Sequence, residues 1–89
     1  MNQDEVVDNV RRFFDQYRHE VPGFPSVEIV LAGVKEDRGW YYVPVARRDT
    51  SLRAYHYYDH LNAIETRLRR ELGLDVLFVP ARPTSPLAA

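Results

Sequence analysis

Apolar residues in positions 3–20 recur every three or four positions, which is the spacing of one face of an α-helix. Charged residues occupy the opposite side of the same segment. Asn2 and Glu5 have the spacing of a capping box at its start. Two prolines and a glycine in residues 21–26 end the helix. The predicted core-facing stripe consists of Val6, Val7, Val10, Phe13, Phe14 and Tyr17.

A second amphipathic helix is predicted over residues 52–72. Gly73 has the place of the left-handed residue that ends a helix, and Leu74 can supply the hydrophobic contact that accompanies such an ending. Tyr57 and Tyr58 are expected to close the core at the start of this helix. Its predicted apolar face consists of Ala54, Tyr57, Tyr58, Leu61, Ile64, Leu68 and Leu72.

Three segments are rich in β-branched and aromatic residues and predict strands, at 27–34, 40–46 and 75–80. Residues 35–39 form a polar segment that ends in glycine, which is typical of a hairpin loop. Pro44 has no N–H to donate to a neighbouring strand, so it favours an edge position for the strand that contains it.

The element order predicts an α+β fold, a two-layer α-β-β-α-β domain with both helices on one face of a three-stranded sheet. An edge position for Pro44 favours the strand order 2-1-3, which is antiparallel throughout. The alternative order, 1-2-3, requires a parallel crossover between the last two strands. A single domain is expected over residues 1–80, followed by a mobile tail at 81–89 that has little to bury.

The predicted strands are apolar on both faces, because side chains alternate along a strand and apolar residues occupy both parities. Two helices can cover only one face, so the other face is expected to form an interface. A second copy of the chain is the simplest occupant, which predicts a homodimer; another protein or a ligand remains an alternative. The predicted interface residues are Trp40, Tyr42, Val43, Val76, Leu77, Phe78 and Val79.

Composition narrows the class of protein. Hydrophobic residues make up 45% of the chain and charged residues 28%, as in ordinary globular domains. The absence of cysteine excludes disulfides and thiolate metal sites. No apolar run reaches the roughly 18 residues of a membrane span. The acidic N-terminus does not resemble a signal peptide, so a cytoplasmic protein is expected.

The charged residues are distributed unevenly along the chain, although its net charge is only −1. This distribution suggests an alternative function, a single-stranded nucleic-acid (RNA) binding module. Residues 1–37 carry a net charge of −4, whereas residues 38–70 carry +4. Arginine next to aromatic rings can attract phosphates and stack bases. Self-association is preferred to this alternative. Its candidate residues are Arg38, Trp40, Tyr41, Tyr42, Arg47, Arg48 and Arg53.

Candidate chemistry is sparse. His56 and His60 lie four positions apart in the segment YHYYDH and could hold a metal or act as acid and base. Tyr57 occupies the position where the zinc-protease motif requires a glutamate. There is no glycine-rich phosphate loop and no serine nucleophile elbow. The sequence therefore predicts a self-associating binding or regulatory module with no cofactor and no catalysis, and a metal-dependent or acid/base enzyme at His56 and His60 is a further alternative.

Overall fold

The computed structural model describes residues 2–47 and 53–81, and both helices lie where the apolar periodicity predicts them. Helix α1 spans Gln3–Glu20, and Asn2 and Glu5 form the predicted capping box. Helix α2 spans Ala54–Leu72, and Gly73 follows it in the left-handed conformation with a φ of 67°. The N–H groups of Gly73 and Leu74 donate to carbonyls of the last helical turn, which would otherwise lack partners.

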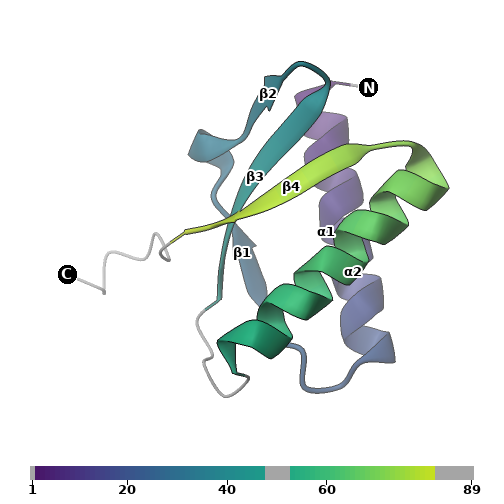
Figure 1. Ribbon diagram of the computed structural model, residues 1–89, viewed down its shortest axis with the longest axis vertical. Helices are drawn as coiled ribbons and strands as arrows, with labels where there is room; N and C mark the ends of the chain where they lie inside the picture. Colours follow the sequence, from purple (N-terminus) through teal and green to yellow (C-terminus); the bar gives the residue numbers. More distant parts are fainter. Residues whose placement is uncertain (1, 48–52, 82–89) are drawn as a thin grey trace.

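The sheet is built around one long strand, β3, which spans Trp40–Arg47. Strands β1 (Val27–Ile29) and β2 (Lys35–Asp37) pair with it antiparallel along one side. Strand β4 (Asp75–Pro80) pairs with it in parallel along the other side. Figure 1 shows α1 and α2 together on one face of this sheet. The predicted α+β class and its layer of two helices are confirmed.

The favoured strand order was wrong. The strand that contains Pro44 is central, and α2 connects it to a parallel neighbour, as the alternative order 1-2-3 requires. The predicted strand 27–34 is broken by a 3₁₀ turn, η1, at Leu31–Gly33. Residues 35–37, predicted as loop, form β2, so the described sheet has four strands. Residues 82–89 of the predicted tail lie outside the described residues, while the Ala81 N–H still donates to the Val45 carbonyl.

Pro44 is tolerated in the central strand because its neighbour is interrupted at the same level. The Val30 N–H donates to the Pro44 carbonyl at 2.9 Å, and β1 gives way to η1 immediately afterwards. The side of Pro44 that lacks an N–H therefore faces the gap between β1 and β2. A Cβ atom on Gly33 would lie 2.7 Å from Cγ of Pro44, so the turn can approach the ring only with glycine at this position.

The hairpin between β2 and β3 turns through two residues, Arg38 and Gly39, rather than through the five predicted. Both have positive φ, 55° and 85°, as a type I′ turn requires. Glycine adopts this conformation without penalty, whereas arginine does so at some cost. The tight turn holds Trp40 at the start of β3, directly opposite Asp37.

The core lies between the helices and the inner face of the sheet. Ile64 and Leu68 of α2 and Val43 of β3 are fully buried. Burial of an aliphatic side chain of this size stabilises the fold by about 1.5–3 kcal/mol.

Within the described residues, neither helix is long and apolar enough to cross a membrane.

The free edge of β4 is largely blocked. The Ala81 N–H points toward β3, so by alternation the N–H groups at positions 76, 78 and 80 point toward the free edge. Pro80 has no N–H, and the Phe78 N–H donates to the Glu65 carboxylate of α2 at 2.8 Å. Such features oppose the pairing of a further strand with a sheet edge.

Substitution of Glu65 tests whether an acceptor or a charge is needed at this edge. Burial raises the pKa of Glu65, and the Phe78 N–H and Arg69 only partly offset that effect. Because the folded-state pKa is raised, the stability contributed by this carboxyl is largest below its unfolded pKa and falls as pH rises through the folded pKa.

We expect Glu65→Gln, which keeps an acceptor without the charge, to be at least as stable as the natural chain at pH 7. Its advantage should shrink toward pH 4. Glu65→Ala should lose about 1–2 kcal/mol at pH 7, because the Phe78 N–H loses its partner. Urea unfolding of the three chains at both pH values measures these differences. Equal losses in Glu65→Gln and Glu65→Ala would contradict the role of the acceptor.

Candidate functional site

The face of the sheet that no helix covers carries a row of large apolar side chains. Trp40 and Leu77 are exposed, at 36% and 42% of their surface, while Tyr42, Pro44 and Val79 are half-buried. The strand registers place Tyr42 beside Leu77 and Pro44 beside Val79 on this side. We call these five residues the outer sheet face.

Charged groups surround the outer sheet face. The Arg69 guanidinium lies 5.3 Å from the centre of the Trp40 ring, and its Nε donates to Asp75 at 2.9 Å. Lys35 and Asp37 of β2 lie directly opposite Tyr42 and Trp40. An apolar centre with a charged rim is the usual composition of a protein–protein contact surface.

The structure divides the predicted interface into two sets. Trp40, Tyr42, Leu77 and Val79 lie on the outer sheet face. Val43, Val76 and Phe78 lie on the inner face, where 0%, 2% and 6% of their surfaces are exposed. Those three belong to the core of the chain itself, so they support a contact surface only from beneath.

The arginine and aromatic residues considered for nucleic-acid binding are separated along β3. Arg38 and Trp40 lie at the hairpin end of the strand. Arg47 lies at the opposite end, where its guanidinium packs 4.5 Å from the centre of the Tyr57 ring. Arg53 is exposed before α2, and Arg48 lies outside the described residues.

Tyr41 is also separated from its neighbours in the sequence. It lies on the inner side of β3, opposite Glu36 of β2 and packed against the core. Burial raises the pKa of the Tyr41 hydroxyl, and the nearby carboxylates of Glu36 and Glu5 raise it further. Only Trp40 and Tyr42 of the three consecutive aromatics face outward as possible stacking platforms.

The segment YHYYDH at the start of α2 is partly core and partly surface. Tyr57 is buried, as predicted, but Tyr58 has 42% of its surface exposed and is not a core residue. His56 is exposed and packs against the Tyr55 ring. His60 is half-buried, and its Nδ1 is hydrogen-bonded to the Tyr17 hydroxyl of α1. The two histidines therefore have different surroundings despite their helical spacing.

His60 belongs to a contact that joins the two helices. Its ring also packs edge-on against Phe24, and Arg67 of α2 forms a bidentate ion pair with Glu20 of α1 at 2.8–2.9 Å. The Arg67 hydrogen bonds lower the pKa of Glu20. Within residues 2–47 and 53–81 no three histidine or acidic side chains come together as a metal site.

Tyr57 holds a buried hydroxyl that has no hydrogen-bond partner among the described residues. Burial raises the pKa of this phenol to about 12, although the nearby Arg47 charge opposes the increase. Because the folded state disfavours the tyrosinate, this group contributes stability below about pH 10 that is lost as pH rises toward about 12.

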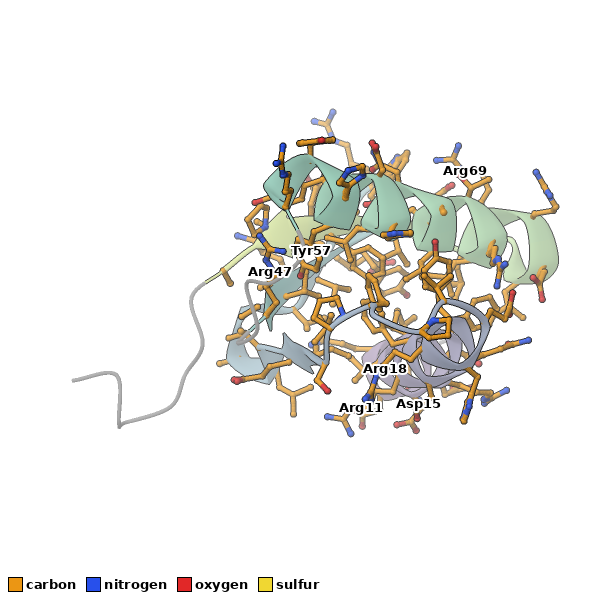
Figure 2. The ribbon with its side chains drawn as sticks, turned by 90° about the horizontal axis from the view of Figure 1, so that it is seen from below. Arg11, Asp15, Arg18, Arg47, Tyr57 and Arg69 are labelled. Atoms are coloured by element: carbon orange, nitrogen blue, oxygen red, sulfur yellow. The ribbon has the colours of Figure 1, made fainter. Side chains whose placement is uncertain are left out.

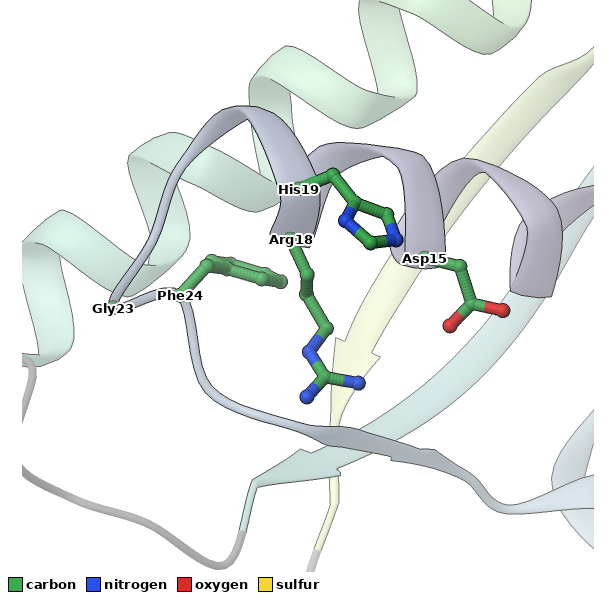
Figure 3. Close-up of a pocket in the computed structure, with 5 residues that line it drawn as sticks. All are labelled: Asp15, Arg18, His19, Gly23 and Phe24. Carbon is green, nitrogen blue, oxygen red and sulfur yellow. The ribbon is translucent and has the colours of Figure 1, made fainter.

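Open hollows lie along the side of α1 that carries its charged residues. One of them is lined by Asp15, Arg18, His19, Gly23 and Phe24. Figure 3 shows Arg18 and Asp15 pointing from α1 toward the side where the chain continues from Phe24 into β1. Periodicity places Asp15 and Arg18 on the charged side of this helix, opposite its apolar stripe. Their proximity to β1 depends on the tertiary packing.

Comparisons of this chain with protein-family models, with curated proteins and with solved structures gave no match. The surfaces themselves are therefore the basis for a functional proposal.

Two tyrosine substitutions distinguish a useful hydroxyl from an unpartnered one. We expect Tyr17→Phe to lose about 0.5–1.5 kcal/mol of stability, because the hydrogen bond to His60 disappears. Tyr57→Phe removes a hydroxyl without a described partner and should leave stability unchanged or slightly higher. Thermal unfolding of both variants at pH 7 makes the comparison. A larger loss in Tyr57→Phe than in Tyr17→Phe would show that the buried hydroxyl is satisfied in solution.

Proposed function

We propose that this chain is a non-catalytic binding module that associates with itself through the outer sheet face. The proposal rests on one observation: both helices cover the same face of the sheet, and the opposite face exposes Trp40 and Leu77. Monomeric domains rarely leave a contiguous apolar patch in water unless it serves as a contact surface.

A second copy suits this surface because a two-fold contact brings the same patch of both copies together. Each apolar residue then meets an apolar surface without a separate partner. The charged rim supports the same arrangement, since Arg69, Asp75, Lys35 and Asp37 supply both signs of charge around the aromatic centre. Charges at a rim contribute mainly to orientation, while the buried aromatic and aliphatic groups supply most of the affinity.

The nucleic-acid alternative has less support from the geometry. Its arginines lie at opposite ends of β3, and Arg47 packs against Tyr57 within the chain. Binding through Trp40, Tyr42 and Arg38 alone would weaken steeply with salt, because phosphate contacts release counterions.

Self-association is tested by the mass in solution and by two matched leucine substitutions. At roughly 0.5 M salt, where surface charges are screened within a few Å, we expect a mass near twice 10.4 kDa. Leu77→Lys should give a monomer, because it places a charge in the apolar centre. Leu72→Lys changes a leucine of similar exposure, 39% against 42%, at the end of α2. That control should retain the mass of the natural chain.

Light scattering on a sizing column makes these measurements, and circular dichroism verifies that each variant is folded. A monomeric natural chain, or an unchanged mass for Leu77→Lys, would contradict the proposed contact.

A further inference from the structure

The two edges of the sheet differ in whether they can accept another strand. β4 is blocked at Phe78 by Glu65 and at Pro80 by the absence of an N–H. β1 has no such protection. Because Val30 donates to β3, alternation turns the N–H and C=O groups of Val27 and Ile29 toward the free edge. Among the described residues, no acceptor is bonded to either N–H.

A stripe of alternating charge runs along α1 beside this open edge. Asp8, Arg11, Asp15 and Arg18 are three, four and three positions apart, so they lie on one side of the helix. Figure 2 shows Arg11 and Asp15 on the side of α1 that faces away from α2. In the described part of the chain, none of the four takes part in an ion pair, unlike Glu20 with Arg67 on the other side of the helix.

The order of charges makes this stripe complementary to itself. Consider a second copy of α1 that runs antiparallel to the first, aligned so that residue 13 of one helix lies beside residue 13 of the other. Position 8 of each helix then lies opposite position 18 of its partner, and position 11 lies opposite position 15. Every opposition then joins an aspartate to an arginine, which gives four pairs over roughly 15 Å of helix. A parallel arrangement in register would instead place every charge opposite a like charge.

The open strand edge and the centre of the stripe lie at the same level. One hollow is lined by Arg11 and Asp15, the middle of the stripe, and by Val27 and Ile29 of β1. A single two-fold axis can therefore serve both elements. We propose that a second copy docks at this edge, pairing β1 with β1 antiparallel and α1 with α1 through the charge stripe.

The strand register follows from the position of Glu28. Glu28 lies opposite Ala46, on the outer side of the sheet. Centring the pair on Ile29 places Glu28 opposite Val30 of the second copy, whereas centring it on Glu28 would oppose two like charges, which is destabilising. The contact then continues the sheet through both copies and leaves the outer sheet face exposed.

This edge contact does not depend on the contact through the outer sheet face, because the two use different surfaces and different forces. Its test is therefore made in the Leu77→Lys background, where the outer-face contact is removed, and at low ionic strength. In that background we expect the chain to form dimers whose dissociation constant rises at least ten-fold between roughly 20 mM and 500 mM salt, as screening weakens the charge pairs.

Two charge-reversed variants then isolate the stripe. Asp8→Arg with Asp15→Arg makes it wholly positive, and Arg11→Asp with Arg18→Asp makes it wholly negative. Each variant alone should be monomeric, whereas an equimolar mixture should regain a mass near twice 10.4 kDa. Asp59→Arg with Glu71→Arg makes the same charge change at exposed positions of α2 and should retain the association.

Amide hydrogen exchange tests the strand half of the contact. In the register centred on Ile29, the Ile29 residues of the two copies face each other, so the Ile29 amide should exchange fast in each charge-reversed variant alone and become protected in the mixture. Circular dichroism verifies that both variants are folded. A monomeric Leu77→Lys chain at low salt, a mixture that stays monomeric, or association that leaves the Ile29 amide unprotected would overturn the proposal, whatever the result for the outer sheet face.

Discussion

A proline in the middle of the central strand is the constraint on which the rest of this sheet depends. Pro44 cannot donate to the neighbour that lies beside it, so an unbroken partner strand would leave a carbonyl without its hydrogen bond. The chain meets this requirement by folding residues 31–33 into a 3₁₀ turn that packs against the proline ring. The neighbour is thereby divided into two three-residue strands, β1 and β2.

This division has consequences at both ends of the sheet. β1 is short and lies at the edge, where the backbone groups of Val27 and Ile29 are open. β2 is carried back to β3 by a two-residue turn, which fixes Trp40 at the rim of the outer sheet face. The opposite edge, on β4, is held by α2 through Glu65. β3 thus has two interrupted strands on one side and one continuous strand on the other. The edge on the interrupted side, at β1, is open, and the edge on the continuous side, at β4, is blocked.

Local signals in the sequence were sufficient for the helices and for the faces of the strands. The capping box at Asn2, the left-handed Gly73 and the alternation along residues 40–46 each involve neighbours within a few positions. Strand order could not be predicted in the same way, because it depends on which distant segment pairs with β3. Pro44 did constrain the sheet, but its missing N–H is accommodated by an interruption in the neighbouring strand rather than by an edge position for its own strand.

The candidate surfaces show the same division between local and distant information. Alternation along each strand predicted that Trp40 lies on the same face as Tyr42, and Leu77 on the same face as Val79. The register of β3 with β4 shows that both pairs lie on one face of the sheet. Alternation could not separate them from Val43, Val76 and Phe78 as contact residues until the positions of the helices were known. Likewise, the spacing of His56 and His60 gave no indication that His60 turns toward Tyr17, forty-three positions earlier.

The small size of the domain explains why its remaining surfaces favour contact with another chain. Two helices cover one face of four strands, and no further element within the described residues covers the other. Apolar area left in this way stabilises nothing until a partner buries it, at about 25 cal/mol per Å² of surface removed from water. The charge stripe on α1 contributes in another way. Its charge pairs mainly fix the orientation of the two copies, and salt weakens the attraction between them. An apolar face and a self-complementary charged edge on one domain can thus be separated by ionic strength alone, because screening weakens the second and leaves the first intact.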